Sequence, residues 1–369
     1  MPRHDAVIVG AGPVGLLLGC LLTQRGWDVV VCERRADADP RTRAIGIHPP
    51  GLEALGAVGL EAAVRAEALA LEGGDVRSMR RTVASLDFTP ERPVLILPQR
   101  RTGALLRARL LDLSAGALLT GATATGLREM GDEVRVSVDA AGEPRELSAS
   151  LVVIADGVRS HLREGLGLGW RRRTGGARYA MLDVDDASAG TRAVLHCEPG
   201  GLVESFPLPA GRRRWVVRQA GATPDASSFG AEITARTGIR PLLPAEARPA
   251  VFTASQHTAR RIVQGRTVLL GDAAHEISPI GGQGMNLGWL DALRLSEVLD
   301  LRGGCPDLRA YQRRARRAAR RAQHRSAFYM AMGAPASAPV VRGREAAMRM
   351  LAAPLLRERT TGMITMASL

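Results

Sequence analysis

The chain has 369 residues, of which 46% are hydrophobic and 24% charged. This length suits two globular domains, and the balance is that of an ordinary globular protein. Aromatic residues make up only 3%, which argues against the stacking platforms that bind single-stranded nucleic acid. The formal net charge is +13, and all 50 basic residues are Arg. A basic surface would attract anionic ligands. The use of Arg without any Lys, however, favours genome composition as the origin of the positive charge.

The cysteine usage and the apolar N-terminus both bear on where the protein works. The four cysteines, Cys20, Cys32, Cys197 and Cys305, show no CxxC spacing. This pattern predicts free thiols in a reducing cytoplasm and no metal site. The run "AVIVGAGPVGLLLGCLL" contains four glycines and a proline, and no cleavage site follows it. We therefore interpret it as a core strand, a turn and a helix, and expect no targeting segment and no membrane span.

Taken in order, the first elements form a βαβ unit. Residues 5–9 are a short apolar run, typical of a buried strand. "GAGPVG" follows, and "LLLGCLLTQRG" then predicts a helix that ends at Gly26. "WDVVVCE" predicts the next buried strand, which ends at Glu33. The unit spans about 30 residues, the size of a mononucleotide-binding half.

The middle of the chain alternates between helical and strand patterns. Residues 52–72 predict a helix, residues 75–98 predict strands or irregular structure, and residues 102–116 predict another helix. Several short strands should follow, with turns at 131–132 and 141–142, and they should end in the buried run "LVVIADG".

The second half begins with an alternating pattern over residues 178–218, which predicts antiparallel strands. A short helix is expected at 228–237, and "RTVLLGD" predicts a return to a buried parallel strand. Helices should cover residues 286–301 and 307–332, with more helix beyond. The pattern predicts an α/β domain that is interrupted by a mainly β segment.

The first glycine cluster carries a specific chemistry. Gly10, Gly12 and Gly15 form GxGxxG directly after a strand, and Glu33 lies 18 residues further on. Gly10 permits the tight turn, Gly12 lets a pyrophosphate approach the backbone, and Gly15 lets helix and strand pack closely. The helix N-terminus offers free N–H groups to phosphates. Glu33 can accept hydrogen bonds from both ribose hydroxyls and would repel a 2′-phosphate, so we do not expect NADP at this site.

A second cluster, "LLGDAAHEISPIGGQGMNLG" at residues 269–288, contains Asp272 and, after it, Gly281, Gly282, Gly284 and Gly288 around the start of a predicted helix. Glycines this dense indicate that a ligand or another backbone comes very close to the chain. Three other stretches accompany it: "PRTRAIGIHP" at 40–49, "LPQRRTGALL" at 97–106 and "VVIADGVRSHLR" at 152–163. With the βαβ unit, they resemble the class A flavoprotein monooxygenases, the para-hydroxybenzoate hydroxylase-like family of FAD-dependent aromatic hydroxylases. The resemblance covers roughly residues 5–330.

The resemblance implies an α/β fold with a Rossmann-like FAD-binding domain of the glutathione reductase type. A mainly antiparallel β substrate domain should interrupt it, and helices should follow. The expected boundaries are 1–72, 99–172 and 266–305 for the FAD-binding domain, 73–98 and 173–265 for the substrate domain, and 306–369 for the C-terminal helical region.

The same resemblance implies roles for individual residues. Asp272 should bind the ribityl and pyrophosphate part of FAD, and the amides of Met285 and Asn286 should face the N1–C2=O edge of the flavin. His48 should reach the substrate side. Asp156 should lie near the crevice of FAD and nicotinamide, although a structural Asp-Gly turn explains it nearly as well. The expected cofactor-binding residues are Gly10, Gly12, Pro13, Val14, Gly15, Glu33, Arg34, Arg43, Gln99, Ala124, Asp156, Asp272, Gly282, Gly284, Met285 and Asn286, and the expected catalytic residues are Arg43, His48 and Pro279.

Family mechanism then implies tightly bound FAD and transient NADPH or NADH, since only one GxGxxG is present. The reduced flavin would react with O₂ to a C4a-hydroperoxide, which hydroxylates a small aromatic or polyketide-like substrate. Two alternatives stay open: a flavin oxidoreductase that inserts no oxygen, and a ligand-sequestering flavoprotein. The Arg-rich segment 313–325 suggests a nucleic-acid-binding protein as a further alternative, but a solvated helix explains this segment better. We expect a monomer or homodimer, without nucleic acid.

Overall fold

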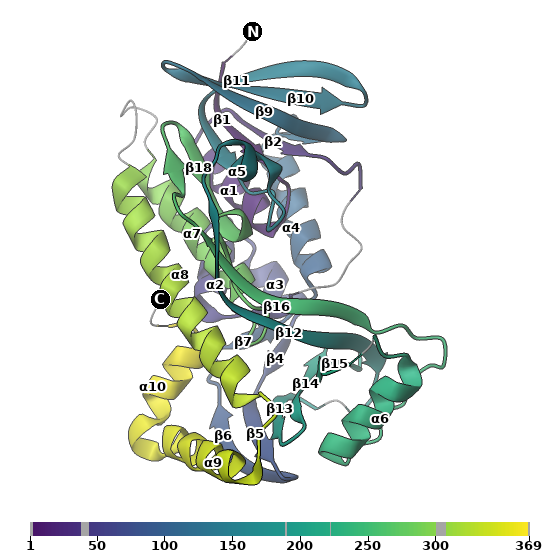
Figure 1. Cartoon of the computed structure of the whole chain (residues 1–369). Helices are drawn as coiled ribbons and strands as arrows, with labels where there is room; N and C mark the ends of the chain where they lie inside the picture. The colour runs from purple at the N-terminus through teal and green to yellow at the C-terminus, as the bar shows by residue number, and fades with distance from the viewer. Residues whose placement is uncertain (1–2, 38–43, 189, 222, 300–307, 368–369) are drawn as a thin grey trace.

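The computed structural model describes residues 3–37, 44–188, 190–221, 223–299 and 308–367 (Figure 1). Two large sheets lie at opposite ends of the molecule, and long strands run between them (Figure 1). Helices flank the first sheet, and the last helices lie beside the second. The predicted α/β architecture, with a mainly antiparallel β region and C-terminal helices, is confirmed.

The first sheet has eight strands around a parallel centre. Its path is β17-β18-β11-β1-β2-β8, and a β9–β10 hairpin pairs antiparallel with β11. Val7 of β1 lies opposite Val152 of β11 and Val30 of β2, both in parallel register. Parallel strands buried on both faces are near-continuous apolar runs, which explains "AVIV" and "LVVI". The strands are β1 Arg3–Val9, β2 Val29–Glu33, β8 Leu118–Thr120, β9 Ala122–Met130, β10 Glu133–Ala140, β11 Glu143–Ile154, β17 Val263–Gln264 and β18 Thr267–Leu269.

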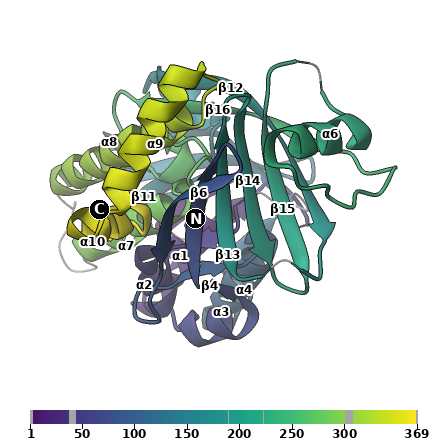
Figure 2. The ribbon, with the colours of Figure 1, turned by 90° about the horizontal axis from the view of Figure 1, so that it is seen from below.

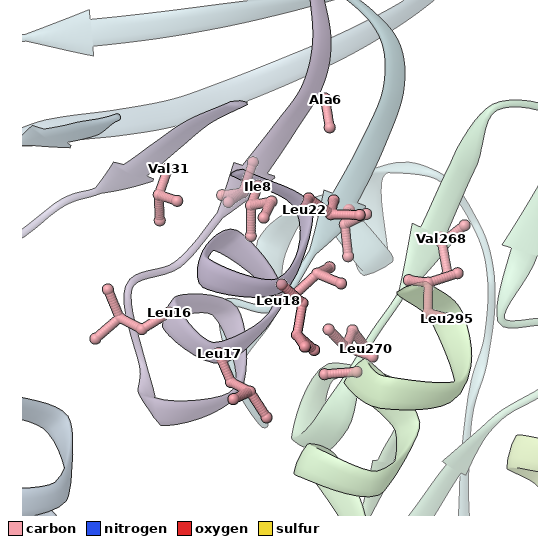
Figure 3. Close-up of a cluster of buried hydrophobic side chains, with 14 of the residues drawn as sticks. Ala6, Ile8, Leu16, Leu17, Leu18, Leu22, Val31, Val268, Leu270 and Leu295 are labelled. Carbon is pink, nitrogen blue, oxygen red and sulfur yellow. The ribbon is translucent and has the colours of Figure 1, made fainter. Parts of the chain in front are cut away.

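Helix α1, Pro13–Gln24, packs against this sheet and against α7, Gly284–Val298. Figure 3 shows Leu18 and Leu22 of α1 close to Leu270 and Leu295. All these leucines are at most 1% exposed. Burial of one such side chain contributes about 1.5–3 kcal/mol, so this apolar cluster fixes the glycine turn ahead of α1. The other helices near the first sheet are α2 Pro49–Gly56, α3 Glu61–Glu67, α4 Gln99–Leu113 and α5 His161–Gly165.

The second sheet also has eight strands, in the order β19-β16-β12-β15-β14-β13-β5-β6. All neighbours are antiparallel except β13 and β5. Helix α6, Ala226–Thr237, begins with a capping box at Asp225 and buries Phe229 and Ile233 against one face. The strands are β5 Gly73–Ser78, β6 Arg81–Asp87, β12 Trp170–Asp185, β13 Arg192–Glu198, β14 Gly201–Leu208, β15 Arg212–Gln219, β16 Ala250–Ala259 and β19 His275–Glu276.

A third, small sheet corrects the prediction of one helix over residues 52–72. The chain forms α2, a turn, α3 and then β4, Leu69–Leu71. Gly59 in the turn has a φ of 79°, a conformation that only glycine adopts readily and that ends the helix. Strand β7, Val94–Ile96, pairs with β4 and with β3, Gly46–Ile47.

The C-terminal helices pack on helix α7 and on the edge of the second sheet. Helix α8, Leu308–Met332, packs on α7. We expected arginines around most of segment 313–325, yet one face is a buried stripe of alanines that includes Ala315, Ala318 and Ala322. Helix α9, Ala338–Ala352, contacts β6, the edge of the second sheet, and α10, Pro354–Ile364, packs on α9 (Figure 2). Every helix in the described part of the chain is too short or too polar to span a bilayer.

Candidate functional site

One cavity of about 1650 Å³ connects the two large sheets. Its walls come from the glycine turn before α1, the loop before α7, the cavity-facing side of the second sheet, and helices α8 to α10. Typical small-molecule sites measure about 300–1,000 Å³. The cavity therefore has room for more than one small molecule, for example a dinucleotide and a substrate.

The glycine turn at one end of the cavity is shaped for a dinucleotide. A Cβ placed on Gly10 would lie 2.5 Å from the carbonyl oxygen of Ala155, and one on Gly15 would collide with the carbonyl oxygen of Gly10. A Cβ on Gly12 would meet nothing within 4 Å. Gly10 and Gly15 thus permit close backbone packing, while Gly12 borders open space. Because no side chain caps α1, its first N–H groups remain available to a phosphate.

Glu33 closes this turn from the end of β2. Its carboxylate accepts hydrogen bonds from the backbone N–H of Ala11 at 2.9 Å and of Arg35 at 3.1 Å. Its side chain is mostly buried and lines the cavity. A carboxylate has about four acceptor sites, so Glu33 retains the capacity to accept hydrogen bonds from ribose hydroxyls.

The second glycine cluster serves two different purposes. Asp272 and Pro279 are exposed at the cavity wall, and α7 begins at Gly284 without a side-chain cap. Its first N–H groups and the positive end of its dipole therefore border the cavity. A Cβ on Gly288, in contrast, would lie 2.5 Å from Val14 Cγ2. Gly288 therefore lets α7 pack against α1. The many glycines of this segment thus reflect helix packing as well as the close approach of a ligand.

Asn286 is completely buried and does not line the cavity. Its Oδ1 accepts a hydrogen bond from the backbone N–H of His48 at 2.9 Å. Its Nδ2 donates to the carbonyl oxygens of Gly46 at 2.9 Å and Gly282 at 3.2 Å. This side chain fastens the loop before α2 to the loop before α7. That role could not be predicted from the sequence, because His48 and Gly46 lie about 240 positions away.

His48 is buried at the start of α2 and lines the cavity. Its Nδ1 has no hydrogen-bond partner among the described residues. Burial lowers the pKa of His48 to about 4, so the imidazole is neutral near pH 7 and can both donate and accept. Its Nε2 would lie 3.6 Å from a Cβ on Gly282, which places the ring beside the loop that precedes α7.

Asp156 has a second unpaired polar atom at the dinucleotide end. Its Oδ1 is buried and finds no hydrogen-bond partner in the part of the chain that the structure describes. Burial raises the pKa of its carboxyl, and the hydroxyl of Ser160 partly opposes that effect. A buried polar atom without a partner is costly. Since Asp156 lines the cavity, a ligand there could supply the missing hydrogen bond.

The structure brings nearly all expected site residues to this cavity. Gln99 also accepts a hydrogen bond from the N–H of Ala44 at 3.1 Å. Gly15 and Asn286 lie behind the cavity wall, and Arg43 is outside the described residues. The expected residues that line the cavity are Gly10, Gly12, Pro13, Val14, Glu33, Arg34, His48, Gln99, Ala124, Asp156, Asp272, Pro279, Gly282, Gly284 and Met285.

The opposite end of the cavity is lined mainly by apolar side chains that sequence analysis did not nominate. Phe206 of β14 packs against a small apolar cluster and also lines the cavity, together with Leu202 and Glu204. The alternation of these three residues along a strand was a usable signal. Tyr329 of α8 and Met348 of α9 close this end.

A stack of side chains joins the two ends of the cavity, at the place where β12, β16 and β19 meet. The guanidinium of Arg163 lies 3.8 Å from the ring centroid of Trp170, and Trp170 stacks on His257 with centroids 5.3 Å apart. His257 Nδ1 is 2.5 Å from Glu276 Oε2, and Glu276 lines the cavity. Cation–π and aromatic contacts of this kind each contribute about 0.5–2 kcal/mol, so the stack stabilises the junction.

Together, the parallel sheet, its GxGxxG turn and the helix N-termini at the cavity define a dinucleotide-binding α/β protein. The family model of an FAD binding domain matches residues 3–326. A 12-dehydrotetracycline 5-monooxygenase/anhydrotetracycline 6-monooxygenase of Streptomyces rimosus is 32% identical over 327 residues, which cover 79% of this chain and 62% of that relative. The chain thus spans about three fifths of the length of that relative. It belongs to the para-hydroxybenzoate hydroxylase-like family of FAD-dependent aromatic monooxygenases.

Solved structures agree with the family. An anhydrotetracycline hydroxylase from Streptomyces rimosus superposes with a TM-score of 0.82 at 28% identity, covering 100% of this chain and 77% of that one. A p-nitrophenol 4-monooxygenase from Pseudomonas putida gives a TM-score of 0.86 and covers 98% of both chains. Because its identity is 23%, that likeness shows the fold alone. The predicted Rossmann-like FAD-binding fold is confirmed.

Proposed function

We propose that the protein is an FAD-dependent monooxygenase that consumes NADH or NADPH and O₂ and hydroxylates a small aromatic or polyketide-like compound. The observation that carries this proposal is the cavity of about 1650 Å³, in which a dinucleotide-shaped end opens into an apolar end. The tetracycline-type substrates in the names of relatives such as the 32%-identical one support the substrate class.

The residues of the first end fit FAD in their chemistry. The space at Gly12 and the N-terminus of α1 suit a pyrophosphate, and Glu33 suits the ribose of the adenosine. Asp272 would hold the hydroxyls of the ribityl chain. The N-terminus of α7, at Gly284 and Met285, would stabilise negative charge on the reduced ring. When bound, FAD supplies the redox chemistry: it accepts a hydride from NAD(P)H and activates O₂.

The apolar end would bind the substrate and exclude water. Leu195, Phe206 and Val216 form an apolar floor on the second sheet, and Met348 and Met363 of the C-terminal helices lie over the cavity. Such an environment would hold a flat aromatic ring against the flavin by apolar contact and would keep water away from the reaction. The neutral imidazole of His48 would border the reacting ring without adding charge.

The test combines flavin spectroscopy with mass spectrometry. Purified protein loaded with FAD is mixed with NADH or NADPH without oxygen and is then exposed to air with candidate substrates. We expect bleaching of the flavin, reoxidation in air, and a product that has gained one oxygen atom from ¹⁸O₂. Reduction without oxygen gain would favour an oxidoreductase. Tight ligand binding that does not accelerate NAD(P)H consumption would favour a sequestering flavoprotein. A chain that does not bind FAD would overturn the proposal.

A further inference from the structure

One acidic side chain lies in the middle of the apolar end of the cavity. Glu204 is on β14, the fifth strand along the second sheet, where its Cα lies in register with Leu195 of β13 and Val216 of β15. All three side chains line the cavity. Glu204 is only 4% exposed. A carboxyl group is thus buried on the sheet between two apolar neighbours, one on each adjacent strand.

The carboxyl group of Glu204 makes no hydrogen bond and no ion pair within the described residues. Glu198 on β13 provides a contrast, because it is equally buried and accepts hydrogen bonds from the N–H groups of Met79 at 2.9 Å and Arg80 at 3.4 Å. Arg214, which also lines the cavity, binds Asp183 through two hydrogen bonds of 2.6 and 2.8 Å. Among the described residues, Glu198 thus has hydrogen-bond partners within the protein, whereas Glu204 on the neighbouring strand has none.

The unpaired carboxyl implies a partner that enters the cavity. The carboxyl borders the cavity, so a ligand that displaces water from it must supply a hydrogen bond or leave a buried polar group unpaired, which is costly. Burial raises the pKa of Glu204 to about 8, so the group is mainly a neutral acid near pH 7. It can then donate one hydrogen bond and accept others. The titratable neighbours that it influences are Tyr179 of β12 and Cys197 of β13.

We propose that Glu204 selects the substrate by hydrogen bonding to a hydroxyl or carbonyl oxygen on its aromatic ring system. This inference rests on the proposed function, since it places the substrate at the apolar end. A ring system without such an oxygen would leave the carboxyl unpaired, and a site built around a hydrogen bond rejects analogues that lack it. Glu204 is therefore the residue that distinguishes oxygenated aromatic rings from hydrocarbons of similar shape.

The test compares 1-naphthol with 1-methylnaphthalene, which replaces the hydroxyl by a methyl group of similar size. Binding is measured by calorimetry on the FAD-loaded protein. We expect the wild type to prefer 1-naphthol by about tenfold, the value of one net hydrogen bond. Glu204→Leu should abolish this preference by weakening 1-naphthol alone. Glu204→Gln, which keeps a hydrogen-bonding amide, should retain most of it.

Phe206→Leu is the matched control, because it changes an apolar side chain on the same face of the same strand. It should alter the affinity for both probes alike. An infrared band of the protonated Glu204 carboxyl, identified by its loss in Glu204→Gln, should shift when 1-naphthol binds and stay unchanged with 1-methylnaphthalene. This readout serves if Glu204→Leu does not fold.

Equal wild-type affinity for the two probes, or no binding of either, overturns the inference. An equal loss for both probes in Glu204→Leu also overturns it, because that result indicates a structural role. These measurements require no turnover. If Glu204 discriminates the probes but no product gains oxygen, the proposed function fails and the binding role stands.

Discussion

The two ends of the cavity are built in different ways. The dinucleotide end is made of backbone: glycines at 10, 12 and 282 and two helix N-termini without side-chain caps surround the space. The substrate end is made of side chains that alternate along strands, such as Leu202, Glu204 and Phe206.

This difference separates what is fixed from what can vary. A pyrophosphate is recognised through N–H groups and close approach, which few sequences provide. An apolar wall on a sheet accepts many side chains of similar volume, so the second end can change its ligand without altering the fold. We expect substitutions at the first end to affect FAD, and those at the second to affect substrate choice.

The largest expected effect separates two glycines of the same turn. Gly15→Ala forces a Cβ onto the carbonyl oxygen of Gly10, and a backbone shift must follow. We expect the protein to lose about 3 kcal/mol of unfolding free energy and to purify without flavin. Gly12→Ala is the control, because its Cβ meets nothing within 4 Å. It should unfold within about 0.5 kcal/mol of the wild type in the absence of FAD and yet bind FAD more weakly.

Urea unfolding of the apoproteins and titration with FAD check this pair. The two measurements together decide whether the turn is shaped for a ligand. If Gly12→Ala binds FAD as tightly as the wild type, the space at Gly12 does not hold the pyrophosphate, and the cofactor lies elsewhere in the cavity.

A somewhat smaller effect is expected where side chains fasten the two loops of the dinucleotide end. Asn286→Ala removes three hydrogen bonds and leaves the N–H of His48 and the carbonyls of Gly46 and Gly282 without that partner. We expect a loss of about 2 kcal/mol in stability, because each buried hydrogen bond contributes roughly 0.5–1.5 kcal/mol. Thermal unfolding with and without FAD measures it. Substitution at the neighbouring Met285, by Leu, should cost less than about 1.5 kcal/mol.

The first end could be predicted from the sequence because its determinants are local. A strand, three glycines and a helix occur within residues 5–24, and apolar periodicity with GxGxxG suffices to place them. Helix α7 begins at Gly284, two residues before the predicted start at residue 286. Residues 52–72 were interpreted as one helix, because the apolar pattern continues across Gly59, whose positive φ breaks it.

Alternation along β14 was a usable signal for which residues share a face, but the residues of the second end meet only through strand register, which local patterns do not indicate. Nothing local indicates that Glu204 faces Leu195 and Val216, since the order of β13, β14 and β15 depends on tertiary packing. The same limit applies to Asn286, whose partners His48 and Gly46 are remote in sequence. In α8, the charge of the arginines concealed a narrow apolar face of alanines, a residue with little hydrophobic contrast.

The smallest effect compares the two buried acids of the second sheet. Glu198→Gln should destabilise the protein by about 1 kcal/mol, because it weakens the acceptor of two backbone N–H groups. Glu204→Gln should instead become more stable than the wild type as pH rises. Burial raises the folded-state pKa of Glu204 to about 8, above the value of about 4.3 for an unfolded chain. The folded state therefore holds the proton more tightly, and the wild type loses stability between about pH 4.3 and 8.

Glutamine at position 204 carries no proton to lose, so the advantage of the variant should grow over this window and level off above pH 8. We expect it to reach on the order of 1 kcal/mol, less than the pKa difference alone would give, because the carboxyl borders the open cavity and water can reach it. Urea unfolding of both variants and the wild type at pH 5 and pH 8.5 provides the measurement. Equal pH dependence of Glu204→Gln and the wild type would mean that this carboxyl is solvated or paired in solution, and the contrast with Glu198 would then fail.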